Sequence, residues 1–341
     1  MTIEDVARQF TDIPENRPGL FDEMAGTVFA FQRRHCSVYS RYCNEIDTSP
    51  HPEAGPEPHA SVYRPFLPVD AFRHIPVTTF PSDEAEVVFE SSGTGRGRRS
   101  KHYVRNRRIY ERSVEVHFRL VFGDGPFLIV AHLPEYAEES SLVYMIRHLI
   151  ETFGAQGSAF FLGNDDWLEQ ALSRTTEGRT RLLVFGAAFG LIDLLARRQH
   201  HLPESSLVVE TGGMKTHRRE ISRKALHDRL AEGFGVDRTQ VWSEYGMCEL
   251  MSQCYTRGGE TFFPPPWMRF AIVDPFDPFV GVPMGTSGAL ALTDLANLYS
   301  CSYLLTGDRA IQDGHGFQVL GRLTGAELRG CNFLLEDAGP P

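Results

Sequence analysis

Short apolar runs alternate with amphipathic segments through the middle of the chain, and this alternation limits the possible folds more than any other feature. Three apolar runs of strand length are each followed by a segment with helical spacing of apolar residues: 127–131 by 140–153, 181–185 by 192–196, and 206–209 by 219–234. Strands that alternate with helices are typical of βαβ units, in which helices connect parallel strands. We therefore predict an α/β fold with a substantially parallel sheet flanked by helices.

The two ends of the chain show different patterns of apolar and turn-forming residues. Residues 1–48 carry apolar side chains at helical spacing, and residues 48–68 are rich in proline, which cannot continue a helix. Short strands separated by turns are predicted after Val241, at 270–273, 288–293, 302–306 and 317–321. We predict an N-terminal helical segment with its connector at 1–70, and an α/β core with a β-rich C-terminal part at 71–341.

Composition excludes several classes of function. The 341 residues have 42% hydrophobic and 23% charged side chains, as ordinary globular domains do. A net charge of −10 argues against a general nucleic-acid binder. No apolar run approaches the length of about eighteen residues that a membrane span requires. The N-terminus lacks a secretory pattern and the six cysteines are irregularly spaced, so we expect free thiols and a cytoplasmic location.

A glycine-rich loop with hydroxyl and basic residues follows the apolar segment 87–89. Glycine lets a backbone approach an anion closely, and hydroxyl groups and cations can bind its oxygens. The spacing matches neither a P-loop nor a dinucleotide-binding turn. A solvated hairpin turn remains the alternative to a phosphate-binding loop. The residues that we predict to contact phosphate are Ser91, Ser92, Gly93, Thr94 and Gly95, followed by Lys101.

Four further stretches place polar or glycine residues where strands are predicted to end. Each has an ordinary structural alternative: a turn, a half-buried aromatic ring, a turn-forming aspartate or a surface cation. Together, however, their chemistry suits a nucleotide, because glycine can lie against a base, an aromatic ring can stack on it and carboxylates can bind hydroxyls or Mg²⁺. The candidates are Gly212, Gly213, Tyr245, Gly246, Glu249, Asp308 and Arg322.

The order of these motifs resembles that of the adenylate-forming superfamily of acyl- and aryl-CoA ligases and luciferases. Four segments resemble its phosphate loop, its Tyr-Gly-x-x-Glu motif, its Thr-Gly-Asp motif and its Gly-Arg motif: 91–101, 245–249, 303–308 and 321–322. The segments 100–102 and 327–332 are also similar to those of the acyl-protein synthetases of bacterial bioluminescence, which are long-chain-fatty-acid–protein ligases. The resemblance covers about residues 80 to 335.

The resemblance implies a two-step reaction with ATP and Mg²⁺ as cofactors. A carboxylic acid, expected to be a fatty or other hydrophobic acid, would attack the α-phosphate to give an acyl adenylate, and the acyl group would pass to a thiol. The loop and Lys101 would hold the β- and γ-phosphates, and Glu249 would bind Mg²⁺. Asp308 would bind the ribose, and Gly213 with Tyr245 the adenine.

The sequence departs from the superfamily pattern at several points, and it also lacks the hinge aspartate expected near Thr324. Gly95 replaces a threonine of the phosphate loop. Larger members also continue into a mobile lid domain with a catalytic lysine, whereas this sequence ends at Pro341. We therefore expect the lid to be absent or vestigial, so that Lys101 or Arg322 would stabilise the α-phosphate.

Cysteines offer two further hypotheses. Cys331 lies near Arg329, which would lower the pKa of its thiol and allow it to accept the acyl group; a small buried cysteine is the equal alternative. Cys248, Cys254 and Cys301 could bind zinc together with a histidine. Their spacing matches no standard zinc site, so structural thiols are favoured.

Two other functions stay open at this point. The first is a CoA ligase related to phenylacetate–CoA ligases, and the second is a nucleotide-binding module without chemistry. The resemblance also suggests an acyl reductase, an acyltransferase or a carrier protein as a partner.

Overall fold

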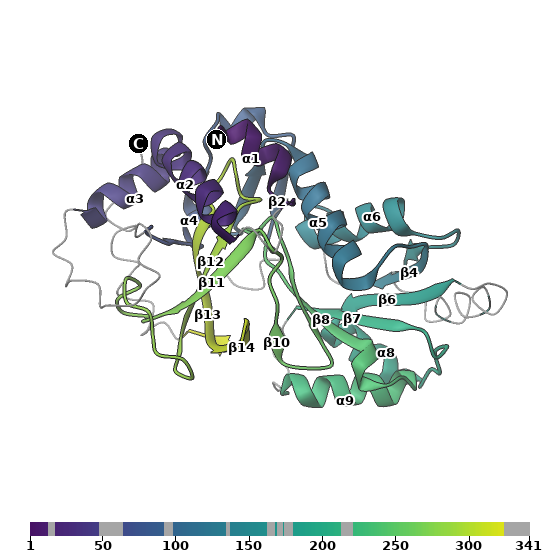
Figure 1. Ribbon diagram of the computed structural model, residues 1–341. Helices are drawn as coiled ribbons and strands as arrows, with labels where there is room; N and C mark the ends of the chain where they lie inside the picture. The colour runs from purple at the N-terminus through teal and green to yellow at the C-terminus, as the bar shows by residue number, and fades with distance from the viewer. Residues whose placement is uncertain are drawn as a thin grey trace.

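The computed structural model describes most of the chain. The described residues are 1–12, 18–47, 64–91, 98–133, 137–161, 168, 173, 180–212 and 221–323. Figure 1 shows a β-rich half, with strands β10–β14, beside a half in which helices cover both faces of a second sheet. The predicted α/β class and the β-rich C-terminal part are confirmed.

Three helices open the chain, as predicted: α1 (Ile3–Gln9), α2 (Pro18–His35) and α3 (Ser37–Asp47). A capping box starts α1, in which Thr2 and Asp5 each bind the backbone N–H of the other. Tyr303 on the β-rich sheet donates its hydroxyl to the carbonyl of Ala25, 2.5 Å away, which attaches α2 to that sheet. The boundary at residue 70 stays a prediction.

A short connection leads from these helices to a hairpin. It contains β1 (Leu67–Pro68), which pairs with β13, then α4 (Ala71–His74) and the 3-10 helix η1 (Ser82–Glu84). The hairpin consists of β2 (Val87–Glu90) and β3 (Lys101–Val104), paired so that Glu90 lies opposite Lys101. The strand β3 was not predicted, and the glycine-rich loop therefore connects two strands of one hairpin.

The central sheet has the strand order β5-β4-β6-β7-β8-β9. All neighbouring strands are parallel except β9, which runs antiparallel to β8. The strands are β4 (Phe127–His132), β5 (Ala159–Phe160), β6 (Arg181–Ala187), β7 (Leu207–Thr211), β8 (Val241–Tyr245) and β9 (Cys254–Arg257). The predicted parallel sheet is confirmed; β5 and β9 were not predicted.

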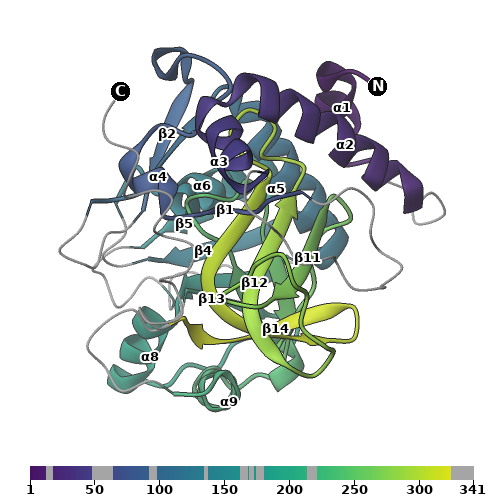
Figure 2. The ribbon, with the colours of Figure 1, turned by 90° about the vertical axis from the view of Figure 1, so that its left-hand side faces the viewer.

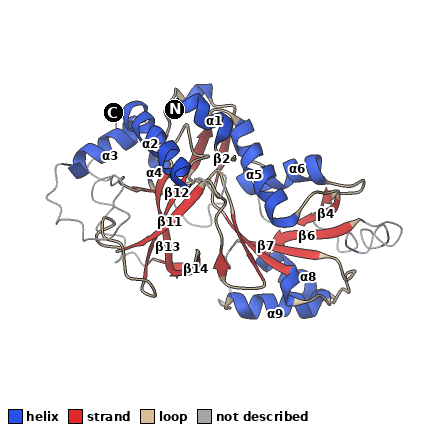
Figure 3. Cartoon of the chain, viewed as in Figure 1, coloured by secondary structure: helices blue, strands red, loops and turns tan. Residues whose placement is uncertain are grey.

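Helices bury both faces of this sheet, which explains its uninterrupted apolar strands. One face packs against α5 (Arg107–Phe122) and α6 (Ser141–Phe153), and the other against α8 (Ala188–Arg197) and α9 (Arg223–Phe234), as Figure 3 shows. Alternate residues of β6 point to opposite sides, because Phe185 belongs to the core with α5 and Val184 to the core with α8. The helix α9 begins later than predicted, after Ser222 caps it.

The β-rich sheet has the order β10-β14-β13-β12-β11 and is antiparallel along this path. A 3-10 helix, η2 (Arg238–Gln240), precedes β8. The strands are β10 (Thr261–Phe262), β11 (Met268–Val273), β12 (Ser287–Asp294), β13 (Tyr303–Asp313) and β14 (Gly316–Arg322). Figure 2 looks onto this sheet and shows α2 and α3 across its upper end.

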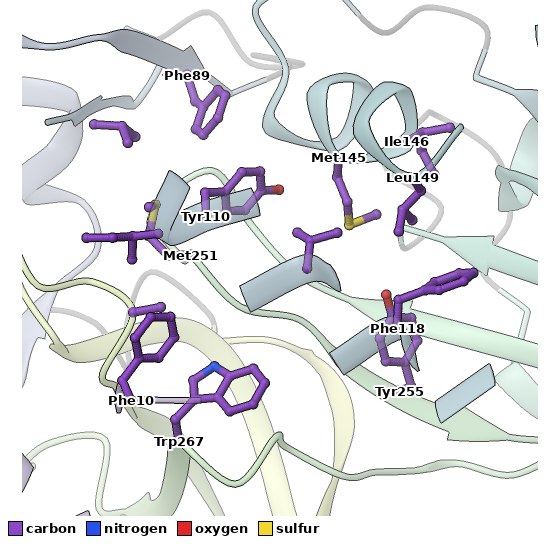
Figure 4. Close-up of a cluster of buried hydrophobic side chains, with 14 of the residues drawn as sticks. Phe10, Phe89, Tyr110, Phe118, Met145, Ile146, Leu149, Met251, Tyr255 and Trp267 are labelled. Carbon is purple, nitrogen blue, oxygen red and sulfur yellow. The ribbon is translucent and has the colours of Figure 1, made fainter. Parts of the chain in front are cut away.

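One hydrophobic core connects the two halves (Figure 4). The ring of Phe10 from the N-terminal region meets Trp267 edge-on at 5.8 Å, and Trp267 donates its indole N–H to Ser252. The same core contains Phe118 of α5 and Tyr255 of β9. Within the described part of the chain, no helix has the length and apolar character that crossing a membrane requires.

Phe118 tests how much this core contributes to stability. Its ring is fully buried. The distance between ring centroids is 4.9 Å to Phe122, 4.9 Å to Phe153 and 5.6 Å to Phe127. We expect Phe118→Ala to lower the free energy of unfolding by about 3–5 kcal/mol, because it leaves a cavity. The control Leu120→Ala lies on the same helix but is 63% exposed, so it should change that energy by less than about 0.5 kcal/mol. Equal losses in urea unfolding would contradict this account.

Candidate functional site

The candidate site lies where β7 and β8 end beside the β-rich sheet. Gly212 directly follows β7 and adopts a left-handed backbone conformation (φ 79°) that favours glycine. Tyr245 is the last residue of β8. The carboxyl ends of parallel strands are the usual place for ligands in such sheets.

Three side chains from separate motifs meet at this point. The hydroxyl of Tyr245 donates to Oδ2 of Asp308 at 2.9 Å, and Nη1 of Arg322 lies 3.2 Å from Oδ1 of the same carboxylate. Burial, and then the Asp308 carboxylate, raise the pKa of Tyr245 well above its usual value, so the phenol stays a donor. Tyr245, Asp308 and Arg322 therefore lie in contact, and their roles in binding a nucleotide stay predictions.

The Asp308 carboxylate is held in a fixed orientation but keeps acceptor capacity. Its side chain is 11% exposed, whereas that of Arg322 is 62% exposed. The backbone N–H of Asp308 also donates to the hydroxyl of Thr306 at 3.2 Å. A carboxylate offers about four acceptor positions, so this one can accept hydrogen bonds from a ligand that approaches from solvent.

Two residues at the strand ends were not predicted as part of the site. Thr211, the last residue of β7, donates its hydroxyl to Oε2 of Glu244 on β8, and both side chains are buried. The other oxygen of Glu244 lies against Gly246, where a β-carbon would collide with it. Any larger residue at 246 would therefore have to displace the Glu244 carboxylate. The sequence offered one signal for Glu244: it is a carboxylate directly before Tyr245, a residue already assigned to the site.

Lys101 lies at the base of the glycine-rich loop. Its ammonium is 2.8 Å from Oε1 of Glu90 across the hairpin, and this contact raises the pKa of Lys101. Its side chain is 49% exposed. Ser91 closes the loop, because its Oγ accepts the backbone N–H of Ser100 and its own N–H donates to the carbonyl of Ser100, both at 3.0 Å.

Several predicted site residues lie outside the described residues. They are Ser92, Gly93, Thr94 and Gly95 of the loop, Gly213 after β7, and Cys331 near the C-terminus. Their assignments stay predictions.

Glu249 lies in the turn that follows β8, and its side chain is buried. The amide of Asn297 holds this turn from behind: Nδ2 donates to the carbonyl of Glu249 at 2.7 Å, and Oδ1 accepts from the N–H of Met251 at 2.8 Å. Asp294 also accepts from the Met251 N–H, at 3.1 Å, and from the hydroxyl of Ser252, at 2.8 Å. Burial raises the pKa of Asp294 to about 6.

His102 connects the glycine-rich hairpin to the same turn. Nδ1 lies 2.9 Å from the carbonyl of Cys248, and Nε2 lies 2.9 Å from the hydroxyl of Ser300. A carbonyl can only accept, so Nδ1 carries the proton and Nε2 accepts from Ser300. Burial lowers the pKa of His102 to about 4. His102 is therefore a hydrogen-bonded core histidine.

The three cysteines proposed as zinc ligands are buried free thiols. Their sulfur atoms contact different partners: Cys248 the carbonyl of Phe89, Cys254 the sulfur of Met268, and Cys301 the carbonyl of Tyr303. Among the residues that the structure describes, no three His, Cys, Asp or Glu side chains are placed to hold a metal ion together. A magnesium ion bound mainly by phosphates needs only one or two carboxylates, so a single carboxylate is compatible with that cation, and its assignment to Glu249 stays a prediction.

The fold is shared with solved acid–CoA ligases. The 2-hydroxyisobutyryl-CoA ligase with 2-HIB-AMP and CoA, in the thioesterification state, superposes with a TM-score of 0.66 at 17% identity, over 93% of this chain and 71% of that chain. Its open conformation gives 0.62 at 17%, over 88% and 69%. ATP-bound MatB from Rhodopseudomonas palustris gives 0.53 at 16%, over 72% and 49%.

No protein-family model matches the sequence, and no curated protein does. At these identities the structural likeness establishes the fold alone, which this chain shares with the 2-hydroxyisobutyryl-CoA ligase and MatB. The chain spans about 70% of the 2-hydroxyisobutyryl-CoA ligase and about half of MatB.

Because the imidazole of His102 is buried and neutral, we expect the protein to lose stability in acid. The native imidazole is neutral, with a pKa of about 4, whereas an unfolded histidine titrates near 6.5, so acid favours the unfolded chain between these values. Between pH 7 and pH 5 this contribution lowers the free energy of unfolding by about 2 kcal/mol. Urea unfolding at both pH values should show this decrease in the wild type relative to His102→Gln.

Asp294 acts in the opposite direction, because its raised pKa adds stability as pH falls through about 6. It is present in both proteins, so the difference between them isolates His102. An identical pH dependence in wild type and variant would contradict the neutral, buried histidine.

Proposed function

We propose that this protein is an ATP-dependent, AMP-forming ligase that activates a hydrophobic carboxylic acid and passes the acyl group to a thiol. The observation that carries the proposal is the contact of Tyr245 and Arg322 with the Asp308 carboxylate. Three motifs that are distant in sequence meet there, at the strand ends of a fold that the solved acid–CoA ligases share.

The nucleoside part of ATP would lie at the ends of β7 and β8. Asp308, oriented by Tyr245, would accept hydrogen bonds from the ribose hydroxyls. The adenine would lie against the backbone of Gly212 and Gly213 and beside the ring of Tyr245, where Gly246 keeps the backbone free of a side chain.

The phosphates would lie between the hairpin loop and the turn that carries Glu249. Ser91, Ser92, Gly93, Thr94 and Gly95 would surround the β- and γ-phosphates with Lys101, and Arg322 would contact the α-phosphate. Glu249 would hold Mg²⁺, which supplies charge neutralisation for the departing pyrophosphate.

In the first step, a carboxylate oxygen of the acid bonds to the α-phosphorus. The bond from that phosphorus to the bridging oxygen of pyrophosphate breaks, and the electron pair leaves with pyrophosphate. Lys101 and Arg322 stabilise the negative charge that builds on the phosphate oxygens. In the second step, a thiolate attacks the carbonyl carbon and AMP leaves with the electron pair.

A fatty acyl chain is the substrate that the aromatic side chains near the hairpin support. Phe89 on β2, Tyr110 on α5 and Tyr144 on α6 have ring centroids 5.1–6.0 Å apart. Phe185 on β6 belongs to the same core. These rings are packed against one another, so an acyl chain would bind beside this cluster, where apolar side chains would favour a hydrophobic acid over a charged one.

The acceptor would be the thiol of Cys331, or a thiol on a carrier protein, an acyl reductase or an acyltransferase. A second candidate is CoA, which the solved 2-hydroxyisobutyryl-CoA ligase binds together with its acyl adenylate. The five described cysteines are buried free thiols, which supports a reducing compartment such as the cytoplasm.

ATP–pyrophosphate exchange with Mg²⁺, measured over acids from short aryl to long-chain fatty acids, tests adenylation directly. We expect exchange that depends on a hydrophobic acid. Glu249→Gln should lower its rate by about 10²–10³-fold, because the carboxylate that would hold Mg²⁺ is lost. Glu232→Gln, on an exposed position of α9, is the matched control and should leave the rate unchanged. ATP binding without exchange by any acid would contradict the proposal.

The acceptor is tested by Cys331→Ser with radiolabelled acid. A label on the wild-type protein that survives denaturation, is released by neutral hydroxylamine and is missing in the variant would identify Cys331. AMP release that requires CoA and persists in the variant would instead select the CoA ligase.

A further inference from the structure

A buried polar segment, residues 294–302, lies behind the turn that carries Glu249. It binds three parts of the chain at once: the turn through Asn297 and Asp294, β3 through Ser300, and α2 through Gln32. We call this segment the hub loop. Of its side chains, only Cys301 was singled out from the sequence, as a possible zinc ligand.

Asn297 contacts the turn directly after Glu249, at the two peptide groups that flank Leu250. It is 1% exposed, and it donates to the carbonyl of Glu249 while it accepts the N–H of Met251. Its Nδ2 also donates to the carbonyl of Cys301 at 3.0 Å, within the hub loop. One side-chain amide therefore fixes the backbone of Glu249 relative to the hub loop.

Gln32 fixes the hub loop relative to α2. This side chain is fully buried, and its Nε2 lies 2.8 Å from the carbonyl of Asn297 and 3.0 Å from that of Leu298. Its Oε1 accepts the N–H of Ser302 at 2.9 Å. The N-terminal helix thus reaches Glu249 through Gln32 and Asn297.

We propose that Asn297 is a positioning residue for Glu249, and that Gln32 sets the position of Asn297. This inference rests on the proposed function, because it assumes that Glu249 holds Mg²⁺. The peptide groups before and after Glu249 are both held, by His102 at the Cys248 carbonyl and by Asn297 at the Glu249 carbonyl. These bonds limit the directions in which the Glu249 carboxylate can point, and the cation requires a narrow octahedral geometry. The N-terminal helices therefore belong to the working site as well as to the fold.

Asn297→Asp is the sharpest variant, because it keeps the volume and the acceptor for the Met251 N–H. It replaces the donor to the carbonyls of Glu249 and Cys301 with an acceptor that repels them. We expect the Mg²⁺ concentration for half-maximal ATP–pyrophosphate exchange to rise about 10–100-fold, the scale found when partners of metal ligands are lost. Gln32→Glu should shift it in the same direction by less.

The matched control is Tyr39→Phe. It removes a buried hydrogen bond from the same N-terminal layer, where the Tyr39 hydroxyl donates to the carbonyl of Pro65 at 2.7 Å and so donates to no atom of the hub loop. Its Tm should fall while its Mg²⁺ dependence stays that of the wild type. An unchanged Mg²⁺ dependence in Asn297→Asp, or an equal shift in Tyr39→Phe, would overturn the proposal.

A second readout separates this inference from the proposed function. Amide hydrogen exchange of the peptide 246–253 should become about tenfold faster in Asn297→Asp, since a buried polar mismatch promotes local opening. Exchange at the wild-type rate would overturn the positioning role whatever the protein catalyses. Faster amide exchange in a protein whose wild type activates no acid would overturn only the proposed function. Should Asn297→Asp fail to fold, Gln32→Glu decides by the same two readouts.

Discussion

The buried hydrogen bonds of the hub loop are the constraint on which the arrangement of this molecule depends. Hydrophobic packing brings the N-terminal helices, the hairpin and the two sheets together, but it does not fix their relative positions to within a fraction of an ångström. Directional bonds from Gln32, Asn297 and His102 do so at one place. A buried polar group without its partner costs about 1–3 kcal/mol, so each of these contacts excludes shifted arrangements.

The charges at the candidate site indicate which kind of ligand it can bind. The chain has a net charge of −10, and the candidate site adds the carboxylates of Asp308 and Glu249. These carboxylates repel the negative charges of a triphosphate, so basic side chains or a bound metal ion must offset that repulsion. Arg322 and Lys101 each have a carboxylate partner and remain about half exposed or more, so both can also contact a ligand. This balance suits a magnesium nucleotide better than a free anion.

Much of the fold could be predicted because strands buried on both faces produce continuous apolar runs, as in β4, β6 and β7. The start of α8 was missed, since residues 186–191 are apolar or glycine throughout and mark no boundary. The motif residues Tyr245, Asp308 and Arg322 were found because their order carried the signal. Gln32 and Asn297 were not found, because their contact joins positions 265 residues apart and has no local pattern.

The central claim is that a carboxylate attacks the α-phosphorus of ATP at the meeting of the two sheets. The most direct measurement supplies the acid with ¹⁸O in its carboxyl group, together with ATP, Mg²⁺ and a thiol or hydroxylamine as acceptor. Our account predicts that one ¹⁸O atom from each acid consumed appears in AMP, detected by mass spectrometry. AMP formed without label would mean that water attacks the phosphorus, which would contradict acyl-adenylate formation.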